Sequence, residues 1–194
     1  MNPLIFLTKS VVEEYIKNGK IIKPLRDLPE EFLERKAGVF VTINTKYKIR
    51  DTKYELRGCI GTYLPTRKNI AEEIIYNAIA AATEDYRFNP IKKEDLPYLS
   101  YTVYILSEPK LVKDIKELDP KKYGIIVKTE GFSPFSDVIF NPSPKPYQKT
   151  GLLLPDLKGI DTAEKQISIA RQKAGINPTT EQFLIYKFTV EKYE

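Results

Sequence analysis

Seven short runs of β-branched and aromatic residues dominate the sequence, and only four segments between them have the pattern of a helix. The runs cover residues 39–44, 54–63, 99–107, 123–128, 138–140, 152–154 and 183–190. Because the helical segments do not alternate strictly with these runs, the order favours an α+β protein over a doubly wound fold. We expect a mostly antiparallel sheet flanked by helices, and no internal repeat is evident.

Four helices are predicted from capping residues at their starts and from glycine near their ends. The predicted starts are Ser10 with Glu13, the position after Pro29, Asn69 with Glu72, and Asp161 with Glu164. The first helix is predicted to end at Asn18-Gly19, the second before Gly38, and the fourth at Gly175.

Two residue types limit the chemistry that this chain can perform. It has no His and a single Cys, Cys59, so it contains no Ser-His or Cys-His pair, and we expect no metal site. One Cys cannot form an internal disulfide, which fits a reducing compartment. The sequence has neither a membrane span nor a signal peptide, and we expect a cytoplasmic protein.

The charge of the chain gives little information about partners. The net charge is +5 and the pI is about 9.0, but Lys and Arg are interspersed with Asp and Glu. A mildly basic surface of this kind is typical of a well-solvated protein, and nucleic acid is not an expected partner. The many Lys and Glu residues, with one Cys and one Met, resemble the composition of thermophile proteins.

The segment Leu56-Arg57-Gly58-Cys59-Ile60-Gly61, called the signature below, is the best candidate for a chemical centre. In a strand of period two, Leu56 and Ile60 share the side that faces the core, and Arg57 and Cys59 share the opposite side. Glycines in strands often mark bulges, and a bulge at Gly58 would exchange the sides of the residues that follow Gly58.

Cys59 has two chemical interpretations. Gly58 and Gly61 remove side chains around the sulfur, so a ligand or another backbone could approach, and Arg57 would stabilise a thiolate. The alternative is that Cys59 is a small buried hydrophobe and the signature is architectural. Gly58 and Gly61 also match the Gly-x-x-Gly loop of KH domains, but that loop joins two helices, whereas this segment is predicted to be a strand.

The run from Leu56 to Thr62 is similar to the signature of the AMMECR family. Other blocks resemble the family in the same order, at residues 38–42, 80–88, 95–97, 123–127, 151–156 and 173–176. Because the blocks span residues 38–178, the chain is identified as a member of the archaeal or bacterial type over most of its length.

The resemblance implies an α+β fold in which residues 1–194 form one domain unit with a larger and a smaller lobe. It also implies that the signature lies near the cleft between these lobes. Gene neighbourhood and fusion within the family imply a pathway link to Memo-like and radical-SAM proteins. The resemblance supplies neither a reaction nor a cofactor. The chain departs from the family in its Pro-rich loop at 141–147, and Lys149-Thr150 stand where a tighter basic turn is common.

Further candidates follow the third predicted helix. Glu84 or Asp85 could be the general base that a protein without His needs, and Arg87 could hold an anion. The alternative is a solvated helix end in which Arg87 pairs with a carboxylate. Asp156 is either an acid in the cleft or a turn residue beside its proline.

Two functions from different classes are consistent with these residues. The first is binding of a small anionic ligand, a nucleotide or a protein partner at a cleft lined by the signature, through Arg57, Gly58, Gly61 and Arg87. The second is an enzyme or enzyme subunit in which Cys59 is a thiolate nucleophile or ligand, Arg57 holds an anion, and Glu84 or Asp85 moves protons.

Overall fold

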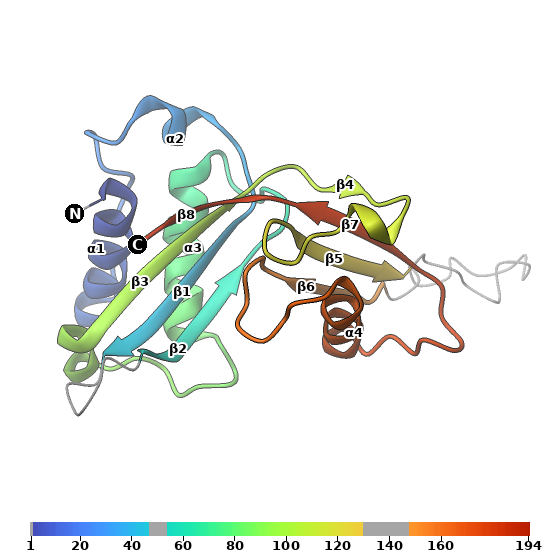
Figure 1. Cartoon of the computed structure of the whole chain (residues 1–194). Helices are drawn as coiled ribbons and strands as arrows, with labels where there is room; N and C mark the ends of the chain where they lie inside the picture. The colour runs from blue at the N-terminus through green and yellow to red at the C-terminus, as the bar shows by residue number, and fades with distance from the viewer. Residues whose placement is uncertain (1, 47–53, 130–147) are drawn as a thin grey trace, which may run out of the picture. The chain divides into compact units, whose positions relative to one another are not determined.

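The computed structural model describes residues 2–46, 54–129 and 148–194 (Figure 1). The chain divides into two compact units, of which unit 1 consists of Met1–Glu108 and Glu191–Glu194, and unit 2 consists of Pro109–Val190. The strand predicted at residues 138–140 and the Pro-rich loop at 141–147 lie outside the described residues. No described helix is long and apolar enough to cross a membrane.

Unit 1 is built on a four-stranded sheet in the order β2-β1-β3-β8. Its strands are β1 (Val39–Lys46), β2 (Tyr54–Gly61), β3 (Leu99–Leu106) and β8 (Val190–Tyr193). β1 is a central strand, because it pairs antiparallel with both β2 and β3. Val39, Val41 and Ile43 alternate along β1 and are fully buried, as expected for a strand with one face against a core.

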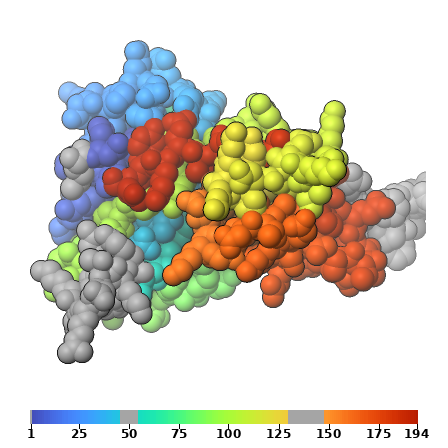
Figure 2. Space-filling model, in the orientation of Figure 1, coloured from blue at the N-terminus to red at the C-terminus, as the bar shows by residue number. Residues whose placement is uncertain are grey.

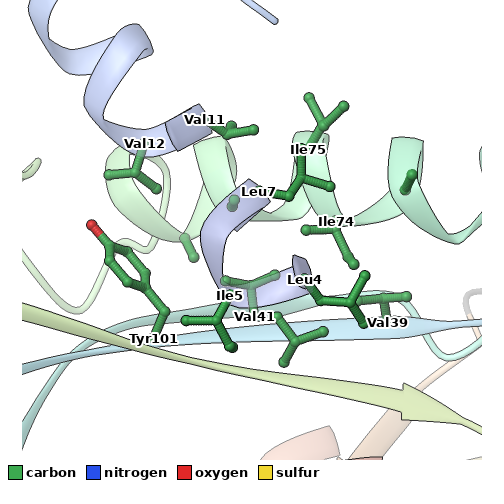
Figure 3. Packing of buried hydrophobic residues seen from close by; sticks show 14 of the residues in the cluster. Leu4, Ile5, Leu7, Val11, Val12, Val39, Val41, Ile74, Ile75 and Tyr101 are labelled. Atoms are coloured by element: carbon green, nitrogen blue, oxygen red, sulfur yellow. The ribbon is translucent and has the colours of Figure 1, made fainter. Parts of the chain in front are cut away.

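Helices α1 (Pro3–Asn18) and α3 (Ile70–Thr83) pack together over this face of the sheet. Figure 3 shows their apolar side chains against Val39 and Val41, and the labelled helical residues include Leu4, Leu7, Ile74 and Ile75. The short helix α2 (Glu30–Glu34) and the 3-10 helix η1 (Lys93–Tyr98) complete the unit.

The C-terminal strand β8 is held beside α2. The Tyr193 ring packs edge-on against Phe32 with centroids 6.1 Å apart, and Arg35 pairs with Glu191 at 2.6 Å. Figure 2 shows this contact between the last residues of the chain, in red, and the α2 region, in light blue. The end of the chain is therefore part of the packing of unit 1.

Unit 2 contains a second four-stranded sheet, in the order β4-β7-β5-β6. Its strands are β4 (Lys110–Leu111), β5 (Gly124–Thr129), β6 (Thr150–Leu153) and β7 (Phe183–Phe188). Helix α4 (Ala163–Ala174) packs on β5 and β6, and the 3-10 helix η2 (Ile115–Glu117) precedes β5. The core of the unit is formed by Ile125, Val127, Leu153, Ile167, Ala170 and Ile176.

The predicted α+β class is confirmed by these two antiparallel sheets with helices packed on them. The start predicted for the first helix is wrong, because Asn2 caps α1 by accepting a hydrogen bond from the Leu4 amide at 2.9 Å. Ser10 therefore lies inside the helix. Asn69 caps α3 as predicted, whereas Thr162 rather than Asp161 caps α4.

The predicted strands that lie within the described residues match observed strands to within about two residues at most of their ends, but two larger differences occur. The run predicted at 183–190 is divided into β7, which ends at Phe188, and β8, which begins at Val190. These two strands belong to different sheets. β4 was not predicted, because two exposed residues are too few to show an alternating pattern.

The signature strand β2 contains an irregularity that corrects the predicted arrangement of its side chains. Ile43 pairs with Gly58 and Asn44 pairs with Leu56, so Arg57 is an extra residue on β2. A bulge of this kind reverses the alternation of side chains. Ile60 packs against the core, whereas Leu56 is 40% exposed. The predicted core face shared by Leu56 and Ile60 is therefore wrong.

Both glycines of the signature have a packing role. A Cβ at Gly58 would lie 2.0 Å from the carbonyl oxygen of Ala81, so only glycine lets β2 approach α3 this closely. A Cβ at Gly61 would lie 2.3 Å from the ring of Phe40. Neither glycine needs a ligand to explain its presence.

We predict that Gly58→Ala lowers the free energy of unfolding by about 3 kcal/mol, because the new methyl group would push β2 away from the backbone of α3. Chemical denaturation of the purified protein measures this change. Glu55→Ala, an exposed position on the same strand, is the control and should change stability by less than about 0.5 kcal/mol. Equal stability of Gly58→Ala and the wild type would contradict the packing role.

Candidate functional site

The outer edge of β2 is closed at Cys59 by two residues that follow α3. The Cys59 amide donates a hydrogen bond to Oδ2 of Asp85 at 2.8 Å, and its carbonyl oxygen accepts one from Nη2 of Arg87 at 3.4 Å. β2 is an edge strand, and unpaired backbone groups on such an edge invite other strands to pair. Asp85 and Arg87 satisfy these groups where a further strand would otherwise do so.

The side chains of Asp85 and Arg87 also bind each other through two hydrogen bonds. Nε of Arg87 donates to Oδ1 at 2.9 Å, and Nη2 donates to Oδ2 at 2.7 Å. The Arg87 guanidinium holds the pKa of Asp85 at about 2, aided by the Cys59 amide and opposed by burial. The same pairing raises the pKa of Arg87. Asp85 is therefore a buried carboxylate that stays ionised at neutral pH.

Arg57 is held by a different segment. Its guanidinium donates hydrogen bonds to the carbonyl oxygens of Asn89 and Pro90, and it pairs with Asp95 at 3.3 Å. These contacts hold the bulge of β2 to the segment between α3 and η1 and to Asp95 in η1. The structure thus brings Cys59, Asp85 and Arg87 together, while Arg57 binds residues 89–95.

The Cys59 thiol lies on the face of the sheet opposite the core. Cys59 pairs with Thr42, whose neighbours Val41 and Ile43 point into the core, so Thr42 and Cys59 point away from it. The Sγ atom is 3.3 Å from Oγ1 of Thr42, and the residue is half-buried. Within residues 2–46, 54–129 and 148–194, no group of three or more Cys, Asp or Glu side chains is arranged to hold a metal.

The loop after the signature is organised by Glu73, which the sequence pattern did not single out. Glu73 is 1% exposed, and its carboxylate accepts hydrogen bonds from the hydroxyls of Thr62 and Thr66 and from the amides of Thr66 and Arg67. Burial opposes ionisation, but these hydrogen bonds outweigh it and lower the pKa of Glu73. The sequence does not indicate this role of Glu73, because Glu is common in the first turn of helices.

Tyr86 is the most exposed large side chain of this region, at 95%, although it stands between two anchored residues. Sequence reasoning named its neighbours Asp85 and Arg87 but not Tyr86 itself. Glu84 is exposed and forms the C-cap of α3. Asp156 in unit 2 has a φ of 55°, and its amide donates to the carbonyl oxygen of Pro120, which fits the turn interpretation.

Lys149 has a structural contact in unit 2. Its Nζ donates hydrogen bonds to the carbonyl oxygen of Gly175 and to Glu181, both at 2.8 Å. A cation at this position interacts favourably with the C-terminal end of α4. Lys149 therefore ties the start of β6 to the end of that helix.

Comparison with known proteins assigns the family. The AMMECR1 family model matches residues 5–193. The chain belongs to the AMMECR1 family. The family predicted from the signature is thereby confirmed, and the match extends beyond the blocks that indicated it.

Relatives of this AMMECR1 chain occur in bacteria and archaea. A protein of Thermotoga maritima is 46% identical over 193 residues, which cover 100% of this chain and 98% of the relative. A longer protein of Clostridium acetobutylicum is 39% identical over 194 residues, which are 36% of its length. The crystal structure of uncharacterized protein PH0010 from Pyrococcus horikoshii has a TM-score of 0.79 and 32% identity, covering 97% of this chain and 88% of that chain.

We predict that Asp85→Asn destabilises the protein by about 2 kcal/mol at pH 7, because the ionised carboxylate binds Arg87 and the Cys59 amide. The pKa of Asp85 is about 2 in the folded protein and the ordinary pKa of Asp is 3.8, so this stabilisation is present above pH 3.8 and is lost as the pH falls toward 2. Denaturation of both proteins across this range measures the difference. Glu84→Gln, an exposed neighbour, is the control, and a difference that stays constant down to pH 2 would contradict the assignment.

Proposed function

We propose that this AMMECR1 chain is a binding module that docks a protein partner at the edge of β2, with Tyr86 and Arg87 as the main contacts. The observation that carries the proposal is the 95% exposure of Tyr86 in a segment that is otherwise fixed. Asp85 and Arg87 are both hydrogen-bonded to Cys59, so the backbone on each side of Tyr86 is anchored. An aromatic side chain presented in this way contributes little to the fold.

The chemistry of the segment resembles that of an interface centre. Tyr and Arg are enriched among the residues that dominate binding energy in protein interfaces. The Arg87 side chain is 44% exposed and retains donor groups that face solvent. Leu56, on the same edge strand, adds an apolar side chain that is 40% exposed. Anchoring of the segment before binding reduces the conformational entropy that a partner would have to overcome.

A small anion is supported less well as the ligand. Arg87 is paired with Asp85 and Arg57 is paired with Asp95, so each guanidinium near the signature has its charge balanced by a carboxylate. An ion pair attracts a free anion much more weakly than an uncompensated cation does. The two signature glycines are explained by packing against Ala81 and Phe40 rather than by a bound group.

A covalent mechanism also has less support. Asp85, one of the predicted bases, accepts a hydrogen bond from the Cys59 amide, but its pKa of about 2 makes it a weak proton acceptor. Its two oxygens already accept hydrogen bonds from Cys59 and Arg87. Glu84 is solvent-exposed and forms the C-cap of α3, where its backbone amide donates to the carbonyl oxygen of Ala80.

A photo-crosslinking experiment tests the docking proposal. We predict that p-benzoylphenylalanine in place of Tyr86 crosslinks to one discrete protein in cells of the encoding organism, and that excess unlabelled wild-type chain competes for it. The same probe at Tyr98, which is 53% exposed elsewhere on unit 1, is the matched control. Arg87→Ala in the Tyr86-probe variant should reduce the yield at least fivefold. Identical crosslinks at both positions, or none at position 86, would overturn the proposal.

Thiol labelling separates the binding and covalent functions. We predict that iodoacetamide modifies Cys59 in the folded protein no faster than in the chain unfolded by denaturant at the same pH. The physical reason is that the thiol is half-buried and the nearby Arg87 charge is compensated by Asp85. Labelling followed by mass spectrometry over pH 6 to 9 gives both rates. A faster reaction in the folded protein would favour the covalent function.

A further inference from the structure

The loop between β2 and α3, residues 62–69, is held in one conformation by a buried charge. Its middle residues are all exposed, so the loop has no apolar core of its own. The carboxylate of Glu73 on α3 holds it instead. Its Oε1 accepts hydrogen bonds from the hydroxyls of Thr62 and Thr66, and its Oε2 accepts them from the amides of Thr66 and Arg67. Because burial of a carboxylate opposes folding unless hydrogen bonds satisfy it, this network favours a role for the shape of the loop.

Arg67 belongs to this loop, but its charge is not balanced by a carboxylate. Its amide binds Glu73, whereas its guanidinium lies over the ring of Tyr76, with Cζ 3.8 Å from the ring centroid. In the part of the chain that the structure describes, the Arg67 side chain forms no ion pair. Arg57 and Arg87 differ, because each of them pairs with an aspartate. A guanidinium that stacks on a ring still presents its N–H donors in the plane, where a carboxylate can bind two of them.

Apolar surface lies beside this cation. Leu64 is 50% exposed and stands between Thr62 and Thr66, whose hydroxyls reach the same carboxylate oxygen, so Leu64 is at the tip of the loop. The Tyr76 ring is 38% exposed. Lys68, the next residue after Arg67, is also exposed and forms no ion pair with the described residues. The loop thus presents an apolar side chain, an aromatic ring and two unbalanced positive charges.

We propose that Leu64, Arg67, Lys68 and Tyr76, called the Arg67 surface below, bind an acidic segment of a partner protein in which an apolar side chain lies next to a carboxylate. The carboxylate pairs with Arg67, and the apolar side chain packs on Leu64 and the exposed part of Tyr76. Arg and Tyr are enriched among the residues that dominate binding energy in protein interfaces. The hydrogen bonds of Glu73 fix the loop before binding, which reduces the entropy lost when the partner docks.

The same observations disfavour a phosphate group or a nucleic acid as the ligand. Loops that bind phosphate use backbone amides, but the amides of Thr66 and Arg67 already donate to Glu73. The hydrogen bonds to Glu73 outweigh burial and lower its pKa, so a negative charge lies directly under the loop. This charge repels a phosphate dianion more strongly than a single carboxylate. An exposed Leu64 also matches an apolar side chain of a protein better than a sugar-phosphate backbone.

The Arg67 surface is separate from the proposed docking surface around Tyr86. The loop at residues 62–69 precedes α3, and Tyr86 follows it. The helix has 14 residues and is therefore about 20 Å long. The two surfaces lie at opposite ends of one helix of unit 1, so each can be changed without altering the contacts of the other.

Selection from a phage-displayed library of random 12-residue peptides tests the proposal on the full-length chain. We expect the enriched peptides to share an Asp or Glu within two positions of a Leu, Ile, Met or Phe. A fluorescent synthetic copy of the most enriched peptide should bind Arg67→Ala about tenfold more weakly than the wild type, as measured by fluorescence anisotropy. Arg67→Lys should also weaken binding, because an ammonium group lacks the planar donors of a guanidinium.

Two variants are the matched controls. Arg26→Ala removes another exposed arginine of unit 1, and Tyr86→Ala removes the ring at the other end of α3; both should bind the peptide as the wild type does. Enriched peptides without the acidic and apolar pair, no enrichment, or equal binding to Arg67→Ala would overturn the proposal. Loss of binding in Tyr86→Ala alone would also overturn it, while supporting docking at the edge of β2. A labelled single-stranded oligonucleotide that binds more tightly than the peptide and depends on Arg67 would assign the surface to nucleic acid instead.

Discussion

The close approach of Gly58 to the backbone of Ala81 sets the position of the residues around the signature. α3 ends at Thr83, shortly after this contact, so the chain that leaves the helix lies next to the same strand. Asp85 can then reach the amide of Cys59, and Arg87 can reach its carbonyl oxygen. A side chain at position 58 would displace the strand and separate these groups. The contacts of Asp85 and Arg87 with Cys59 therefore require glycine at position 58.

One edge of each sheet, β2 or β6, is protected by a charged side chain from the helix that follows that strand or from the segment just after the helix. Arg87 donates to the Cys59 carbonyl oxygen on β2, and Lys173 donates to the Leu152 carbonyl oxygen on β6. Satisfying edge groups in this way prevents further strands from pairing there. At β2, Asp85 and Arg87 both bind the backbone of Cys59, and the Asp85 carboxylate balances the charge of Arg87. Tyr86 remains as the side chain of this segment that no fold requirement explains, which is why the proposed docking surface is centred on it.

Sequence patterns predicted the features that depend on local structure. Alternation along residues 39–44 and the caps at Asn69 and Gly175 depend on neighbours within a few residues, and these were found. The bulge at Arg57 was misplaced, because its position depends on the register of Ile43 and Asn44 in another strand. The contacts of Asp85 with Cys59 and of Glu73 with Thr62 join distant positions, and no local pattern specifies them.

Elements β1, β2, α3 and β3 of unit 1 follow one another in the same order as β5, β6, α4 and β7 of unit 2, and sequence reasoning did not find this likeness for a related reason. Equivalent residues are separated by different distances along the strands and the helix, so no fixed period exists, and Asn77 and Gln166 make the same contact with side chains of different length. Some side chains recur in both units. A glycine on the edge strand, Gly58 or Gly151, lies against the backbone of the helix, and a helix amide, from Asn77 or Gln166, donates to a backbone carbonyl oxygen. Where unit 1 pairs Thr42 with Cys59, unit 2 pairs Ile126 with Leu152, so this arrangement of strands and helix forms equally well with two aliphatic side chains at these positions. The hydroxyl and the thiol are therefore additions in unit 1, and the thiol lies on β2, the strand whose outer edge is bound by Asp85 and Arg87.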